Sequence, residues 1–161
     1  MSNASPDLLQ RVTAFIYREA RLQDEHQYDA WEALWTDDGV YWIPANADDI
    51  DPEKEMSIIY DNRSRIALRI RQLHTGKRHA QAPPSRLRRV VSNIEIAEVT
   101  ENQIRAFSNA LVFESSLRAD TLWSTRNEYL LRPDGDDFRM ARKNVFLTNN
   151  NRALFTLAFL I

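Results

Sequence analysis

The sequence predicts an α+β protein in which N-terminal helices pack in a strongly curved, mainly antiparallel sheet. Up to about residue 76, apolar side chains mostly recur at helical spacing, whereas residues 87–148 alternate apolar and polar side chains in four long segments. Helices followed by a run of strands are typical of the α+β class. Long strands joined by hairpins twist, so we expect the sheet to curl around the helices. A chain of 161 residues is predicted to form one domain, residues 1–161.

Three helices are predicted in the first half of the chain. Ser5 is a good N-cap and Pro6 suits the first helical position, so the first helix begins there and runs to about Asp24. The second is short and ends at residues 36–39, and the third ends at Gly76. The apolar positions at helical spacing are Tyr28, Trp31, Leu34 and Trp35 in the second helix, and Ile59, Ile66, Ile70 and Leu73 in the third.

The strands are predicted from alternation and from turn residues. Residues 40–43 form a short strand that Pro44 stops, and the acidic residues 45–56 form a loop. The four later strands are residues 87–99, 103–117, 121–132 and 137–148. The Asp134–Gly135 step indicates a hairpin between the last two strands.

Several of these strands carry polar side chains in mid-segment. Strict alternation places Glu114 on a face with Val112, and Asn144 on a face with Met140. A polar group on an apolar face must be hydrogen-bonded, or its burial costs about 1–3 kcal/mol. We therefore interpret these residues as a buried network or a subunit contact. The alternative is a polar cavity with general acid–base chemistry, for which the candidate catalytic residues are His26, Asp61 and His79.

Charge is strongly polarised along the chain. Residues 1–60 carry thirteen acids and four bases, whereas residues 61–90 carry nine bases and one acid. Such asymmetry indicates a charged docking surface, although a solvated helix face would show the same pattern. A sequence pI of about 5.9 and the lack of interleaved aromatic residues argue against nucleic acid. The candidate interface residues are Arg63, Arg69, Arg71, Arg86 and Arg88.

Composition excludes several kinds of site. There is no cysteine, so the chain itself cannot supply thiolates to an iron–sulfur cluster or to zinc. Three glycines cannot build a phosphate-binding loop, and three histidines without a paired motif indicate that the chain holds no metal. Neither an apolar run of membrane-spanning length nor a signal-peptide pattern is present, so we expect a cytoplasmic protein that does not bind membranes.

The order and spacing of short motifs over nearly the whole chain resemble one known family, the small (beta) subunits of aromatic-ring-hydroxylating dioxygenases. The similar segments are residues 15–22, 31–35 (WEALW), 38–44 (DGVYWIP), 59–63, 68–70, 76, 83–86 (PPSR) and 149–161. Residues 46–55 depart from the pattern and leave the substrate group open.

The resemblance implies a cystatin-like fold, a cone shared with nuclear transport factor 2 and scytalone dehydratase. It also implies a mainly structural chain with no cofactor of its own. The partner would be a large (alpha) subunit that carries a Rieske iron–sulfur cluster, a mononuclear iron and the oxidoreductase chemistry of aromatic hydrocarbon catabolism. Self-association as a trimer within an alpha3-beta3 hexamer is implied as well. The alternative is a stand-alone, cofactor-free enzyme of the dehydratase or isomerase type, or a small-ligand binder, on the same fold.

Aromatic residues in the second predicted helix and the short strand after it allow two interpretations. Side chains at helical spacing followed by a strand are most often core, and this is the interpretation we favour. In the pocket interpretation, Trp31, Trp35, Tyr41 and Trp42 line the mouth of a cone-shaped cavity. The apolar tail 154–161 is expected to be buried, either in its own sheet or against a neighbouring subunit.

Overall fold

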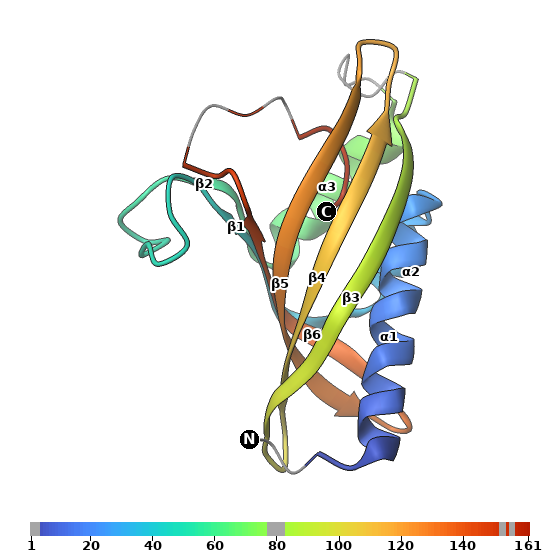
Figure 1. Ribbon diagram of the computed structural model, residues 1–161, viewed down its shortest axis with the longest axis vertical. Helices are drawn as coiled ribbons and strands as arrows, with labels where there is room; N and C mark the ends of the chain where they lie inside the picture. The colour runs from blue at the N-terminus through green and yellow to red at the C-terminus, as the bar shows by residue number, and fades with distance from the viewer. Residues whose placement is uncertain (1–3, 77–82, 152–153, 155–156) are drawn as a thin grey trace.

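The computed structural model describes residues 4–76, 83–151, 154 and 157–161, and it shows helices packed against one curved sheet (Figure 1). The candidate His79 lies outside the described residues. Within them, no helix is long and apolar enough to cross a membrane. The elements are α1 (Pro6–Asp24), α2 (Tyr28–Glu32), β1 (Trp35–Pro44), β2 (Ser57–Asp61), α3 (Arg63–His74), β3 (Arg86–Val99), β4 (Ile104–Ser115), β5 (Asp120–Asp134) and β6 (Asp137–Leu147).

The six strands form one sheet in the order β2-β1-β6-β5-β4-β3. Only the β1–β6 pair is parallel among the strand pairs of the described chain, so the predicted mainly antiparallel α+β fold is confirmed. Strands β3, β4 and β5 are long and twisted, and helix α1 lies along β3 (Figure 1). The hairpin predicted at residues 134–135 joins β5 to β6, with Gly135 at a φ of 61°.

Helix α1 begins and ends as its sequence dictates. The Ser5 side chain accepts a hydrogen bond from the Leu8 N–H at 3.1 Å, which confirms the predicted N-cap. At the other end His26 adopts a left-handed conformation, with a φ of 55°. The Gln27 N–H donates to the Leu22 carbonyl at 2.9 Å, which completes a Schellman turn with His26 in the position that glycine usually occupies.

Two predicted helix boundaries are wrong, because pairing in the sheet overrides local helical spacing. Trp35 does not belong to the second helix: it begins strand β1, and its partner in the sheet is Met140 of β6. Residues 36–39 therefore lie inside a strand rather than after a helix. Gly39 is required there, because a Cβ at this position would lie 2.7 Å from the Trp35 ring. Ile59 likewise belongs to β2 and not to the third helix, which Asn62 caps.

A register shift in β6 corrects the prediction that Asn144 shares a face with Met140. One residue step in β5, from Leu130 to Leu131, is matched by a two-residue step in β6, from Arg142 to Met140. The extra residue is Ala141, and it reverses the alternation that follows it. Lys143 therefore points into the interior, and Asn144 lies on the outer side of the sheet.

The core lies between the helices and the concave side of the sheet. Its largest fully buried side chains come from all parts of the chain, which is why no single segment reveals it. They include Phe15, Ile16, Trp31, Trp35, Tyr41, Ile43, Ile66, Ile70, Tyr129, Leu131 and Met140.

Candidate functional site

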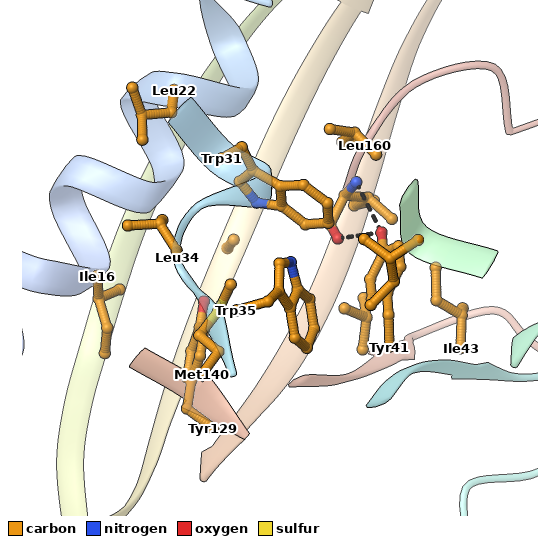
Figure 2. Close-up of a cluster of buried hydrophobic side chains, with 14 of the residues drawn as sticks. Ile16, Leu22, Trp31, Leu34, Trp35, Tyr41, Ile43, Tyr129, Met140 and Leu160 are labelled. Atoms are coloured by element: carbon orange, nitrogen blue, oxygen red, sulfur yellow. Dashed lines mark hydrogen bonds between the residues drawn. The ribbon is translucent and has the colours of Figure 1, made fainter. Parts of the chain in front are cut away.

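The centre of the cone, where a fold of this shape could hold a small ligand, is filled by aromatic side chains. Trp31, Trp35 and Tyr41 pack with ring centroids 5.5–5.9 Å apart. Figure 2 shows these rings side by side, with Leu160 of the C-terminal segment against them. Trp42 points to the other side of the sheet, where it meets Phe146. This packing agrees with the core interpretation of the aromatic residues.

A buried ion pair lies beside the aromatic cluster. Lys143 Nζ lies 2.6 Å from Glu19 Oε1, and each side chain is only 1% exposed. The Trp31 indole N–H donates to the same carboxylate oxygen at 3.0 Å. Burial lowers the pKa of Lys143, while the Glu19 carboxylate opposes that shift. The pair joins helix α1 to strand β6 across the core.

Arg89 forms a second buried contact with helix α1. Its Nε atom lies 2.7 Å from Asp24 Oδ1, and its Nη1 atom donates to Gln23 Oε1 at 2.8 Å. A third group, Nη2, donates to the Leu160 carbonyl at 3.1 Å, so the guanidinium also holds the C-terminal segment. All these partners come from the chain itself, so the Arg89 guanidinium is engaged within the fold.

The C-terminal segment closes the interior. Phe159, Leu160 and Ile161 are buried, as expected for the apolar tail, and the burial is against the protein's own core. The Tyr41 hydroxyl donates to the Ile161 main-chain oxygen at 2.6 Å, and burial raises the pKa of this hydroxyl far above its ordinary value.

The cavity beside the Lys143–Glu19 pair is too small for a ring-shaped substrate. A cavity of about 10 Å³ lies among Gln23, Arg89, Thr125, Asn127 and Lys143. That volume suits at most one water molecule, whereas small-molecule sites occupy about 300–1,000 Å³.

The candidate catalytic residues make separate structural contacts. His26 Nε2 lies 2.8 Å from the Ser85 carbonyl oxygen, and Asp61 accepts from Arg69 Nε at 2.7 Å. The structure therefore does not bring His26 and a carboxylate together as an acid–base pair. Among the described residues no group of three or more His, Cys, Asp or Glu side chains could hold a metal ion.

Glu114 belongs to a buried network, which was the favoured interpretation of its position on an apolar face. The Ser85 hydroxyl donates to Glu114 Oε2 at 2.7 Å, and the Trp123 indole donates to Oε1 at 3.1 Å. Both carboxylate oxygens therefore have a partner, which offsets the desolvation of the charge.

The five candidate interface arginines fall into two groups. Arg63 pairs with Glu32 at 2.8 Å and Arg69 pairs with Asp61 at 2.7 Å, so both are engaged within the chain. The side chains of Arg71, Arg86 and Arg88 are exposed and have no carboxylate partner in the part of the chain that the structure describes. These three remain available to another molecule.

Sequence reasoning missed the three residues that organise the interior. Lys143 was hidden by the register shift in β6, and no short-range pattern relates it to Glu19, which lies 124 positions away. Arg89 was counted in the basic segment but not singled out. Side chains alternate between the two faces of a strand, so Arg89, which directly follows Arg88, faces the side of β3 opposite to Arg86 and Arg88. This alternation could have revealed its position.

Known proteins similar to this chain point to one family. Residues 18–152 match the family described as ring hydroxylating beta subunit. The chain is 31% identical over 144 residues to the small subunit of 2-halobenzoate 1,2-dioxygenase of Burkholderia cepacia, covering 86% of this chain and 87% of that one. It is 29% identical to the small subunit of anthranilate 1,2-dioxygenase of Acinetobacter baylyi, covering 86% of this chain and 88% of the relative.

Solved structures agree with this assignment. The beta subunit of benzoate 1,2-dioxygenase from Burkholderia mallei superimposes with a TM-score of 0.74 at 26% identity, covering 93% of this chain and 95% of that one. A putative scytalone dehydratase from Novosphingobium aromaticivorans has a TM-score of 0.65 at 14% identity, covering 87% and 83% of the two chains. It shares the fold alone, and it confirms the predicted fold class. This chain belongs to the family of ring-hydroxylating dioxygenase beta subunits.

Proposed function

We propose that this chain is the structural small subunit of a multicomponent aromatic-ring-hydroxylating dioxygenase and performs no chemistry itself. The observation that carries the proposal is the filled cone, in which the Trp31–Trp35–Tyr41 cluster and the Lys143–Glu19 pair occupy the place of a substrate. A scaffold that is packed to its centre is rigid, which suits a subunit that supports another chain.

The redox groups of such an enzyme belong on the large subunit. A Rieske cluster is held by two cysteines and two histidines, and this chain has no cysteine. The large subunit would accordingly bind both the Rieske cluster and the mononuclear iron, and would add dioxygen to the ring. This chain would contribute assembly and stability in the cytoplasm.

Assembly is proposed to follow the alpha3-beta3 plan. The exposed and unpaired arginines Arg71, Arg86 and Arg88 support intersubunit contacts, because a guanidinium forms bidentate pairs with carboxylates and arginine is enriched at protein interfaces. Arg71 lies on α3 and the other two lie on β3, so the arginines serve two separate surfaces.

The substrate class is proposed to be an aromatic carboxylate. Relatives of this chain are small subunits of dioxygenases named for 2-halobenzoate, anthranilate, toluate, p-cumate, 3-phenylpropionate or cinnamic acid, and benzoate, which are all benzenoid acids. Because related small subunits occur in dioxygenases named for these acids, we expect the large subunit to accept an aromatic ring that bears a carboxylate group.

The experiment is co-expression of this chain with the products of its neighbouring genes, among which we expect a Rieske-type large subunit. We expect a complex that contains iron, shows the visible spectrum of a Rieske cluster and oxidises benzoate in preference to naphthalene. The chain purified alone is expected to contain no iron and to oxidise neither compound. Isolation of a colourless chain that binds no large subunit would refute the structural role. A complex that prefers naphthalene would refute only the substrate class.

A further inference from the structure

The outer side of the sheet carries an apolar patch that nothing in the described part of the chain covers. Val90 of β3, Leu111 and Phe113 of β4, and Leu122 of β5 lie on adjacent strands, with Val90 opposite Leu111 and Phe113 opposite Leu122. Val90 is 67% exposed and Leu122 is 64% exposed. Contiguous exposed apolar side chains on neighbouring strands mark an interaction surface.

Arginines surround this patch. Arg88 lies opposite Phe113, and Arg86 lies one row further along β3. Arg126 of β5 lies on the other flank, where its guanidinium stacks 4.5 Å from the Phe107 ring. These three arginines are exposed and have no carboxylate partner within the described part of the chain. We call the four apolar residues and the three arginines the arginine-rimmed face.

The arginine-rimmed face is hollowed on one flank. A groove of about 660 Å³ runs beside Leu111, Ser124, Arg126 and Phe146, and residues 46–48 form its far wall. The face therefore offers an apolar centre, a cationic rim and a recess that can accept a projecting segment.

The same chain carries a segment of complementary character. Residues 49–56, between β1 and β2, contain four carboxylates and one lysine, a net charge of -3. Met56 is 74% exposed, and Ile58, which follows in β2, is also exposed, so apolar side chains accompany the acids. In Figure 1 this segment, which we call the acidic knob, projects beyond β1 and β2 and away from β3–β5.

Hydrogen bonds hold the acidic knob in shape. The Tyr60 hydroxyl donates to Glu53 Oε1 at 2.7 Å, and the Asp51 N–H donates to Glu55 Oε2 at 2.9 Å. A second main-chain donor, the Glu53 N–H, binds Asp51 Oδ1 at 3.0 Å. A preformed segment loses little conformational entropy when it docks, which favours its use as an interface element.

We propose that the acidic knob of one copy of this chain docks on the arginine-rimmed face of a second copy. Carboxylates of the knob meet Arg86, Arg88 and Arg126, and Met56 and Ile58 meet the apolar patch. This inference rests on the self-association in the proposed function and adds which two surfaces form the contact. The contact is head-to-tail, because the knob of one copy meets the face of the next copy. Head-to-tail contacts close into a ring when the rotation between neighbouring copies is a whole fraction of a full turn.

The head-to-tail geometry gives the test. The face variant Arg88→Glu/Arg126→Glu retains its knob, and the knob variant Asp49→Lys/Met56→Lys retains its face. Each purified variant is expected to weaken self-association about tenfold or more, because like charges then oppose each other in the contact. An equimolar mixture is expected to recover association, since one intact knob can meet one intact face and the introduced lysines can meet the introduced glutamates. Sedimentation velocity measures all four samples, including the wild type.

Control measurements separate assembly from folding and from the role of the large subunit. The variant Arg21→Glu, on helix α1 and remote from both surfaces, should associate as the wild type does. Thermal melts of all variants should match the wild type, because every substituted side chain is exposed. A wild-type chain that remains monomeric, a face variant that associates normally, or a mixture that associates no better than either variant alone would each overturn the proposal. An iron-containing complex formed by the wild type with its large subunit would leave the proposed function standing in all three cases.

Discussion

Replacement of Lys143 by methionine should destabilise the protein far more than the loss of an ordinary salt bridge. The Lys143 and Glu19 side chains are each 1% exposed, and Lys143 Nζ and the Trp31 indole share one carboxylate oxygen. After Lys143→Met the buried carboxylate retains only the indole donor. Breaking a buried pair by removing one partner costs about 3–5 kcal/mol.

That loss is large beside a total stability of about 5–15 kcal/mol. For a chain of this size each kcal/mol shifts Tm by about 2–4 °C, so the variant should melt roughly 6–20 °C lower. Urea unfolding, followed by tryptophan fluorescence and circular dichroism, measures the free energy of unfolding. The matched control is Arg139→Met, which removes an exposed pair with Asp134 and should cost less than about 1 kcal/mol.

The double variant Glu19→Gln/Lys143→Met separates the charge from the packing. It removes both charges, while the introduced amide oxygen can still accept from Trp31. We expect it to recover most of the stability lost by Lys143→Met, because no unpaired charge remains in the core. The reasoning is refuted if Lys143→Met costs no more than the Arg139 control, or if the double variant is less stable than Lys143→Met alone.

Three further predictions follow from the same structure. Burial raises the pKa of Tyr41 and of Tyr129 above the ordinary value, so their contribution to stability is complete below pH 10 and declines as the pH rises above it. Tyr129→Phe should reduce the alkaline loss by about 1.4 kcal/mol per pH unit in urea titrations at pH 10 and above, and an unchanged slope would contradict this. Arg69→Glu should lower the Tm of the isolated chain because it breaks an intramolecular pair, whereas Arg71→Glu should preserve the melt and weaken co-sedimentation with the large subunit. If Arg71→Glu lowers the melt by as much as Arg69→Glu, the docking role of Arg71 is wrong. Phe159→Ala should cost about 3–5 kcal/mol in urea unfolding because its ring is buried against the core, and a cost below about 1 kcal/mol would show that the tail is not part of it.

The sequence alone determined the elements that depend on neighbouring residues. Ser5 caps α1 because its hydroxyl lies only three residues from the unpaired N–H that it binds. The Asp134–Gly135 hairpin forms because glycine accepts a positive φ. The long alternating strands were predicted to within a few residues because the period of two requires no knowledge of the partner strand. The family was also recognised at this level, because its short motifs keep their order along the chain.

Tertiary structure decided what depends on pairing between distant segments. Trp35 has helical spacing with Trp31, yet it begins β1, because hydrogen bonds to β6 and burial outweigh local propensity. The register shift at Ala141 has no signature in the residues around it, and it alone turns Lys143 inward to meet Glu19. The division of the arginines was likewise decided in three dimensions. Carboxylates within the chain pair with Arg63, Arg69 and Arg89. In the described part of the chain, no carboxylate pairs with Arg71, Arg86 or Arg88. The sequence does not show this division, because only folding determines which opposite charges come close enough to interact.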